Sequence, residues 1–266
     1  MRNSVSDLEE RAESTRRLIL RGLAAAGGGH YGGSLSVVEI LLVLVHEILR
    51  RGPGGPHDRL VFSKGHAAIA LYSVLFDAGK LARSPELYAR FGAGLEGHPD
   101  MRETPEIDFS SGSLGMGLSV ALGMAIATRD KGGRAWAVLG DGECQEGQIW
   151  EAAMLASRLK VPNVRAVIDA NGHQEYGYGT SRQEAEPVHD LAPKLRVFGW
   201  HVVECNGHDV AALYAACAAT AQHRGPAAVV AYTTKGRGHS LIESDPRRFH
   251  CAPYDPSVDA LSGEET

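Results

Sequence analysis

The sequence predicts an α/β fold in three layers, with a mainly parallel sheet covered by helices on both faces. Short apolar runs of strand length alternate along the chain with longer segments in which apolar residues recur at helical spacing. This alternation is typical of βαβ units, which bury a parallel sheet between two layers of helices. With 266 residues, 44% of them hydrophobic, the chain can bury a large core. We expect a single domain over residues 1–266, because no repeat or Pro/Ser-rich linker divides it.

Five short apolar runs are the expected strands of this sheet. In chain order they are Arg59–Ser63, Arg134–Leu139, Val164–Ile168, Trp200–Glu204 and Ala227–Thr233. In an open parallel sheet, ligands bind outside the carboxyl ends of the strands. The residues that directly follow these runs are therefore the first candidates for a functional site.

The expected helices have recognisable start and stop signals. Val5–Ala26 carries apolar residues along one face and ends at three consecutive glycines. A second helix is expected to begin at Ser36, because Ser36 and Glu39 have the spacing of a capping box, and to continue through Val37–Leu49. Three further helices are expected to open at His66, to run from Ser84 to about Phe91 with Pro85 in the first turn, and to span Gly147–Leu159.

The composition excludes several classes of protein. A net charge of −5 gives no sign of a nucleic-acid or membrane-surface partner. The start of the chain, MRNSVSDLEE, is polar and does not read as a signal peptide, and the most apolar helix is too short to span a bilayer. The four cysteines lack the paired spacing of a metal site. We expect a reduced, cytoplasmic protein.

The stretch from Gly140 to Asn171 joins two of the expected strands and is the most informative part of the chain. Asp141 lies between Gly140 and Gly142 directly behind the strand RAWAVL, and Asn171 follows the strand NVRAVIDA. Both side chains are therefore expected at the carboxyl ends of neighbouring parallel strands. One carboxylate and one amide oxygen suit a hard cation such as Mg²⁺, which usually shares its ligand shell with phosphate groups. A bound diphosphate is expected to supply the remaining ligands.

Three histidines occur in glycine-rich loops. His30 lies in GGGHYGG, His66 at a junction between a strand and a helix, and His98 in GLEGHPD. The exposed N–H groups of a helix N-terminus favour anions such as phosphate. A single loop histidine is usually only a surface residue, but three in similar settings indicate a common site.

A fourth loop, SSGSLGMG, precedes a helix of small residues. Its spacing is GxxGxG rather than GxGxxG, and no acidic residue follows at the expected distance, so we exclude a dinucleotide site of the Rossmann type. The alternatives are a loop that approaches a flat ring, with Leu114 in apolar contact, and a helix selected only for close packing.

In order along the chain, the motifs GHYGGSLS, SKGHAAIALYSVL, EGHPD, SSGSLGMGLSVALGMA, GDGECQEGQIWEAAM and KGRGHS with RRFHCAPYD resemble the amino-terminal half of transketolases. They cover roughly residues 10–255. The family uses thiamine diphosphate (ThDP), and its signature is GDG with a downstream Asn. The tail also resembles deoxyxylulose-phosphate synthase, which is a close relative.

The resemblance implies roles for individual residues. Asp141, Asn171 and the backbone carbonyl of His173 would bind Mg²⁺ (or Ca²⁺). The cofactor would be contacted by His66, Gly112, Leu114, Gly140, Gly142, Asn171 and His250. Catalytic roles fall to His30, His66, His98 and His250, which would line the substrate channel, and to Glu146, which resembles the carboxylate of a proton relay between two active sites of a dimer. The tail alignment leaves open whether His239 or His250 is the active-site histidine.

The same resemblance implies a partner. Activation of ThDP in this family needs a Glu on a pyrimidine-binding domain, and the segment after Lys235-Gly236-Arg237 is too short to hold such a domain. We therefore expect the diphosphate-binding subunit of a split transketolase, with the pyrimidine-binding and carboxyl-terminal domains on a second subunit. The simplest assembly is an α₂β₂ heterotetramer.

The expected reaction transfers a two-carbon ketol unit from a ketose, or ketose phosphate, to an aldehyde acceptor. Tyr31 and Met116 stand where the family usually has Pro and Gln, which indicates either drift or a specialised acceptor. Two other functions stay open at this point. One is a ThDP subunit of another reaction, similar to deoxyxylulose-phosphate synthase or a 2-oxo acid dehydrogenase, and the other is a non-catalytic scaffold subunit.

Overall fold

A parallel sheet of five strands forms the centre of the chain. The structure is a computed structural model that describes residues 1–52, 56–175 and 190–259. The strand order is β2-β3-β4-β6-β5, and all four neighbouring pairs are parallel. The strands are β2 (Arg59–Phe62), β3 (Ala135–Gly140), β4 (Val164–Ala170), β5 (His201–Asn206) and β6 (Ala227–Tyr232). All five expected strands are present, with ends that differ from the expectation by one or two residues.

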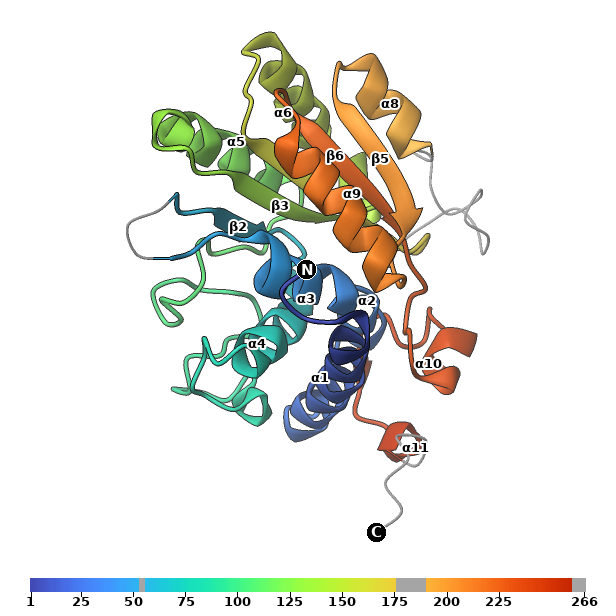
Figure 1. Cartoon of the computed structure of the whole chain (residues 1–266). Helices are drawn as coiled ribbons and strands as arrows, with labels where there is room; N and C mark the ends of the chain where they lie inside the picture. Colours follow the sequence, from blue (N-terminus) through green and yellow to red (C-terminus); the bar gives the residue numbers. More distant parts are fainter. Residues whose placement is uncertain (53–55, 176–189, 260–266) are drawn as a thin grey trace.

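Two hydrophobic cores cover the two faces of this sheet (Figure 1). One face, which includes Trp136 and Val138, packs against helices from the amino-terminal part of the chain and against α9. The other face, which includes Ala137 and Leu139, packs against α5, α6 and α8. Because successive residues of a strand point to opposite faces, each strand contributes to both cores. The three-layer α/β/α architecture is therefore confirmed.

The helices of the two layers have the following bounds. On the first face lie α1 (Val5–Ala25), α2 (Tyr31–Ser36), α3 (Val38–Leu42), the π-helical turn η1 (Val43–Ile48), α4 (Ala68–Asp77) and α9 (Val210–Gln222). On the second lie α5 (Met116–Thr128), α6 (Gly147–Arg158) and α8 (Leu191–Val197). Short 3₁₀ turns at Gly65–Ala67, Pro85–Leu87, Arg129–Lys131 and Gly142–Gln145, and the short helices α10 (Ser240–Ser244) and α11 (Pro256–Asp259), complete the described elements.

The expected capping box at Ser36 is wrong. Ser36 is the last residue of α2, and the following helix is capped at Val37 without a side-chain hydrogen bond. The Ser36 hydroxyl instead donates to Asp169 over 2.7 Å, and Glu39 pairs with Arg16. A tertiary contact with a buried carboxylate has displaced the local capping interaction that the spacing indicates.

The helix expected from Ser84 to Phe91 is also much shorter than predicted. Ser84 accepts a hydrogen bond from Glu86 N over 3.3 Å, as an N-cap does, but only a 3₁₀ turn over Pro85–Leu87 follows. Tyr88 is already extended, and Ala89 has a φ of 55°, in the left-handed region. A helix cannot continue through that conformation. By contrast, the expected helices Val5–Ala26 and Gly147–Leu159 each end only one residue earlier than predicted.

A two-stranded ribbon ties the amino-terminal loop to the tail. β1 (Gly28–Gly29) pairs antiparallel with β7 (Ala252–Pro253), so that Gly28 lies opposite Pro253. A Cβ atom on Gly28, whose φ is +126°, would lie 2.3 Å from the Ala252 carbonyl oxygen, so only Gly fits there. The ribbon brings the segments that carry His30 and His250 together.

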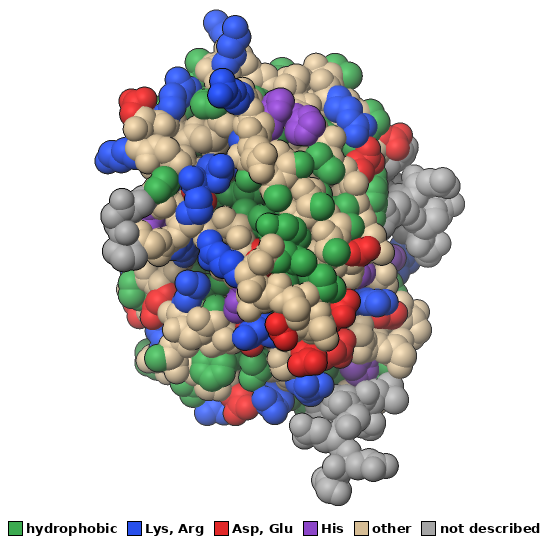
Figure 2. Space-filling view, in the orientation of Figure 1, with side chains coloured by type: hydrophobic (Ala, Val, Ile, Leu, Met, Phe, Trp, Pro, Cys, Tyr) green, Lys and Arg blue, Asp and Glu red, His purple; other side chains and the backbone are tan. Residues whose placement is uncertain are grey.

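The outer surface carries charges of both signs. Lys, Arg, Asp and Glu side chains are interspersed on the face shown in Figure 2. In the described part of the chain, no helix is both long and apolar enough to cross a membrane.

Candidate active site

A cavity of about 370 Å³ opens at the carboxyl-terminal edge of the sheet. It collects residues from segments that are far apart in the sequence. Of the predicted site residues, it is lined by His30, His66, Gly112, Leu114, Gly140, Asp141, Gly142, Glu146, Asn171, His173 and His250. The expectation that these loops converge at one edge is therefore met by the geometry.

The strand register places the two predicted metal-binding side chains together. Gly140 lies opposite Asp169 in the pairing of β3 with β4, so Asp141 and Asn171 follow their strands at the same level. Asp141 is 3% exposed, and its carboxylate accepts hydrogen bonds from Gly142 N over 2.9 Å and from Gly172 N over 2.5 Å. Burial, reinforced by the charge of Asp169, raises the pKa of Asp141 to about 6. A cation bound here would offset the cost of holding this carboxylate ionised.

The remaining ligands of such a cation cannot all be side chains. Among the described residues, no group of three or more His, Cys, Asp or Glu side chains is arranged to hold a metal ion. Asn171 is 7% exposed, and its Oδ1 accepts a hydrogen bond from His173 N over 3.0 Å. One carboxylate, one amide and backbone oxygens fit a hard cation whose shell is completed by phosphate oxygens and water.

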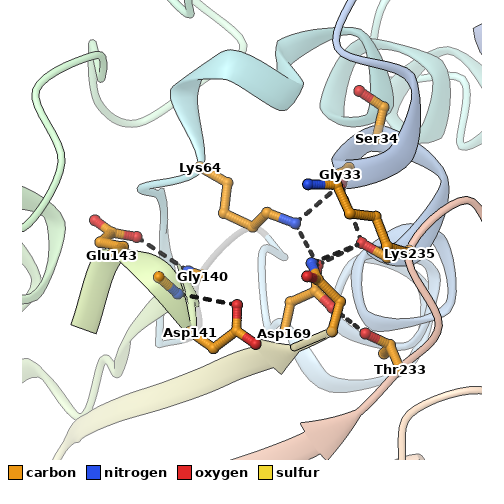
Figure 3. Close-up of polar contacts among 12 residues, drawn as sticks. Gly33, Ser34, Lys64, Gly140, Asp141, Glu143, Asp169, Thr233 and Lys235 are labelled. Carbon is orange, nitrogen blue, oxygen red and sulfur yellow. Dashed lines mark hydrogen bonds and ion pairs between the residues drawn. The ribbon is translucent and has the colours of Figure 1, made fainter. Parts of the chain in front are cut away.

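A buried ion pair that was not predicted from the sequence lies directly behind these ligands. Lys64, which is 2% exposed, donates to the Gly33 carbonyl over 2.9 Å and to Asp169 (Figure 3). Asp169 is fully buried and also accepts from the hydroxyls of Ser36 and Thr233. Burial alone would raise the pKa of Asp169, but the Lys64 charge and these hydrogen bonds hold it below its usual value. Both residues end predicted strands, so the strand-end rule applied to every strand would have found them.

Three of the predicted histidines form a cluster on the cavity wall. The ring centroids of His30 and His66 are 5.2 Å apart, and those of His30 and His250 are 5.9 Å apart. Burial and the nearby Lys64 charge hold the pKa of His66 well below 6.5. Burial and the Lys235 charge lower the pKa of His250 to about 3. These two rings are therefore neutral at neutral pH and can accept as well as donate a proton.

The other two histidines singled out from the sequence lie elsewhere. His98 lies behind Gly112: a Cβ atom on Gly112 would be 3.6 Å from His98 Cδ2. His98 is not among the cavity-lining residues of the described chain, so its role stays a prediction. His239 is buried, with Nε2 2.8 Å from the Val258 carbonyl oxygen. The tail histidine on the cavity wall is thus His250, not His239.

Lys235 is a second functional candidate that was not predicted from the sequence. It lines the cavity, is 4% exposed, and its Nζ lies 2.5 Å from His250 Nδ1. Burial, together with repulsion from Lys64, lowers the pKa of Lys235 to about 8. Gly32 is required beside it, because a Cβ atom there would lie 2.7 Å from Lys235 Cγ. A buried ammonium whose close neighbour is a neutral ring fits an anionic ligand.

Glu143 connects the segments that frame the cavity. Its carboxylate accepts from the Ser63 hydroxyl, from Gly115 N over 2.9 Å and from Gly140 N over 3.1 Å. These donors come from the end of β2, from the glycine-rich loop and from the end of β3. One buried carboxylate therefore sets the position of the loop that carries Gly112 and Leu114. In the sequence, Glu143 is visible only as one letter of a motif.

The chain matches a family model described as "Transketolase, thiamine diphosphate binding domain" over residues 8–260. A 6-deoxy-6-sulfo-D-fructose transketolase subunit, SqwG, from Clostridium sp. (strain MSTE9) is 39% identical over 245 residues, which are 89% of this chain and 88% of that protein. A subunit of the apulose-4-phosphate transketolase of Phocaeicola vulgatus is 36% identical over 272 residues, which are 97% of this chain and 95% of that protein.

Longer transketolases match over part of their length. Human transketolase is 37% identical over 94% of this chain, which corresponds to 40% of the human protein. Among solved structures, the transketolase of Campylobacter jejuni has a TM-score of 0.85 at 26% identity, and the match covers 98% of this chain and 42% of that one. A variant of Pichia stipitis transketolase in complex with fructose 6-phosphate has the same TM-score and identity, and the match covers 98% of this chain and 40% of that one.

The chain thus spans about 40% of the length of these transketolases but nearly the whole length of relatives that are named as subunits. Fold, family model and sequence identity agree. The chain belongs to the transketolase family and carries its thiamine diphosphate-binding domain.

Proposed function

We propose that this chain is the cofactor-anchoring subunit of a two-chain transketolase. It transfers a two-carbon ketol unit from a ketose, or ketose phosphate, to an aldehyde acceptor, and it acts only with a second subunit. That subunit supplies the pyrimidine-binding and carboxyl-terminal domains, and the simplest assembly is a heterotetramer. The relatives named as subunits, which this chain matches almost end to end, support the division into two chains. The observation that carries the proposal is the buried, partly unsatisfied polar edge of the cavity.

The residues present fit ThDP and a divalent cation. In our proposal Asp141, Asn171 and the His173 carbonyl hold Mg²⁺ or Ca²⁺. Lys235 and His66 face the diphosphate, for which they offer a cation and a neutral donor. Gly142 leaves room for close backbone approach, because a Cβ atom there would lie 2.9 Å from the side chain of Gln174.

Leu114 and Gly112 are proposed to contact the rings of the cofactor. Leu114 is 41% exposed in the chain alone, so its apolar surface is available to a ligand. Glu143 fixes the loop on which both residues lie.

The remaining residues are proposed to handle protons and hydroxyl groups. When bound, ThDP supplies the carbon nucleophile that cleaves and forms C–C bonds. His30 and His250, held neutral by burial and neighbouring charges, bind sugar hydroxyls and exchange protons with the oxygen of the reacting carbonyl. His98 supports this wall from behind Gly112. Glu146, at the rim of the cavity, is placed to exchange a proton with a second active site.

The identities of the donor and acceptor are the open part of the proposal. The two similar subunits act on different ketoses according to their names, and their identities to this chain, 39% and 36%, are too close to choose between them. All four cysteines are free, which supports a reduced, cytoplasmic setting.

The test is calorimetric binding of ThDP with Mg²⁺ to this chain alone and to its complex with the complementary subunit. We expect tight binding only by the complex, and a loss of at least ~100-fold in Asp141→Ala, because removing a ligand of the cation exposes the diphosphate charge. Asp130→Ala, which removes an exposed carboxylate far from the cavity, is the matched control and should bind normally.

Two outcomes would count against the proposal. If neither preparation of the intact protein binds ThDP, the chain is a scaffold subunit without the cofactor. If the isolated chain binds as tightly as the complex, the site is complete in one chain and the sharing of the site between subunits is wrong.

A further inference from the structure

The loop that follows β6 is anchored along its length, and it carries Lys235. Thr233 donates its hydroxyl to Asp169, and Gly236 N donates to the Gly32 carbonyl over 3.0 Å. Gly236 has a φ of +86°, and a Cβ atom there would lie 2.5 Å from a methyl carbon of Ile242. A chain held this closely gives the Lys235 side chain a defined starting point.

His208 holds the middle of this loop from outside the cavity. It lies in the connection between β5 and α9, and its Nε2 accepts a hydrogen bond from Thr234 N over 2.7 Å. Because a backbone N–H can only donate, Nε2 must carry no proton, and the ring proton of the neutral histidine lies on Nδ1. Nδ1 lies 3.2 Å from Glu39 Oε2, so the carboxylate selects this tautomer.

Two further buried charges complete the chain of contacts. Glu39, in α3, is 4% exposed, and its Oε1 lies 2.5 Å from the guanidinium of Arg16, in α1. Burial would raise the pKa of Glu39, but His208 and Arg16 together hold it below its usual value. The Arg16 stem also packs beneath the loop, because a Cβ atom on Gly238 would lie 2.7 Å from Arg16 Cδ.

These contacts lie outside the reacting part of the cavity. In the described chain, Arg16, Glu39 and His208 are not among the residues that line it, whereas Lys235 is. A Lys side chain has a flexible four-carbon stem and gains hydration when it leaves a buried site. Without a fixed backbone, the Lys235 ammonium would turn toward water instead of remaining beside His250.

We propose that His208 is a positioning residue of this enzyme: through Thr234 N it holds the loop so that Lys235 stays in the cavity and binds the anionic diphosphate. Arg16 and Glu39 fix the orientation and tautomer of His208. The part that concerns the diphosphate rests on the proposed function, whereas the part that concerns the loop does not.

Hydrogen exchange on the full chain tests the loop. His208→Phe keeps the ring but removes both nitrogens, and His208→Gln keeps an acceptor within reach of Thr234 N. We expect exchange of the peptide that covers Thr234–Gly236 to be at least ~10-fold faster in His208→Phe and within ~3-fold of wild type in His208→Gln. Asp58→Asn, which perturbs the opposite edge of the sheet, is the control for general destabilisation.

Exchange in the loop that stays unchanged in His208→Phe, or that rises equally in Asp58→Asn, overturns the proposal. If His208→Phe does not fold, Glu39→Gln replaces it. That variant keeps the side-chain shape but loses the charge that selects the tautomer, and it should accelerate exchange in the same peptide.

Binding of ThDP with Mg²⁺ to the complex with the complementary subunit tests the link to Lys235. His208→Phe and Lys235→Met should each weaken binding by ~10-fold, and the double variant should be no weaker than Lys235→Met alone, because both changes remove the same interaction. Independent, multiplying effects overturn the link. A wild-type complex that binds no ThDP refutes the proposed function, and the exchange experiment still decides whether His208 holds the loop.

Discussion

The two edges of the central sheet both bury charged side chains, but they satisfy them differently. At the amino-terminal edge, Asp58 is fully buried and accepts four hydrogen bonds, from N, Nε and Nη2 of Arg50 and from Arg134 N. Arg165 is 1% exposed and donates to four backbone carbonyls, including those of Gly225 and His223. Protein groups satisfy these charges, and neither Asp58 nor Arg165 is among the described residues that line the cavity.

At the carboxyl-terminal edge, the outermost charges keep capacity for a ligand. Asp141 accepts its hydrogen bonds from backbone N–H groups, Lys235 contacts a neutral histidine, and both line the cavity. One layer deeper, Lys64 and Asp169 satisfy each other. The comparison teaches that burial of a charge does not by itself indicate function: what marks the site is a buried charge whose best partner is missing from the protein.

The largest effect on folding is expected where a deep pair at the cavity edge is broken. Lys64→Met leaves Asp169 buried without its cation and should lower the free energy of unfolding by about 3–5 kcal/mol. Urea unfolding of the unliganded chain measures this. The double variant Lys64→Met/Asp169→Leu should recover part of the loss, since no uncompensated charge then remains. A single variant as stable as wild type would mean that the pair is not closed in the way the contacts indicate.

The sharpest test of the comparison exchanges one carboxylate for an amide at each edge. Asp58→Asn places an NH₂ group against donors and loses charge-assisted hydrogen bonds, so stability should fall by about 2–3 kcal/mol. ThDP affinity of the folded complex should stay within ~2-fold of wild type. Asp141→Asn should show the reverse: thermal stability of the unliganded chain does not fall, and ThDP binding with Mg²⁺ is lost. Equal stability losses in both variants would remove the distinction between the edges.

The sequence was sufficient for the part of the site that depends on chain direction. Parallel strands place Asp141 and Asn171 at one edge whatever the details of packing, and the register bears this out. It was insufficient where contacts span long separations. Ser36 has the local spacing of a capping residue, but its hydroxyl bonds to Asp169, 133 residues away. Lys235 carries no local signal either, because its importance arises from Gly32 and His250, which the fold brings beside it.

A smaller effect is expected where the carboxylate acts through a loop. Glu143→Gln retains an acceptor for Ser63 or Gly115 but turns an NH₂ group toward another N–H donor. We expect a loss of stability of about 1–2 kcal/mol, from one strained hydrogen bond, and ThDP binding several-fold weaker, because Leu114 is less well placed. Thermal unfolding and calorimetry on the same samples separate the two effects. Glu143→Leu, which removes every acceptor, should be worse in both measurements.

The smallest expected effect concerns pH and a pair outside both edges. The folded-state pKa of Glu39 lies below its ordinary value of 4.5, because His208 and Arg16 outweigh the effect of burial. A lowered pKa means that the unfolded chain binds the proton first, so this contribution is fully present above pH 4.5 and is lost as the pH falls through the folded-state pKa.

The predicted loss is of the order of 1 kcal/mol in the free energy of unfolding, set against the whole acid limb of the curve. Glu39→Gln should flatten the slope between pH 4.5 and pH 3 and leave the curve above pH 6 parallel to that of wild type. Because Glu39 also orients His208, the same variant should accelerate exchange at Thr234 at every pH. A variant that flattens the slope without loosening the loop would separate the charge of Glu39 from its positioning of His208, and it would place the loop's anchor in Arg16 and the glycines instead.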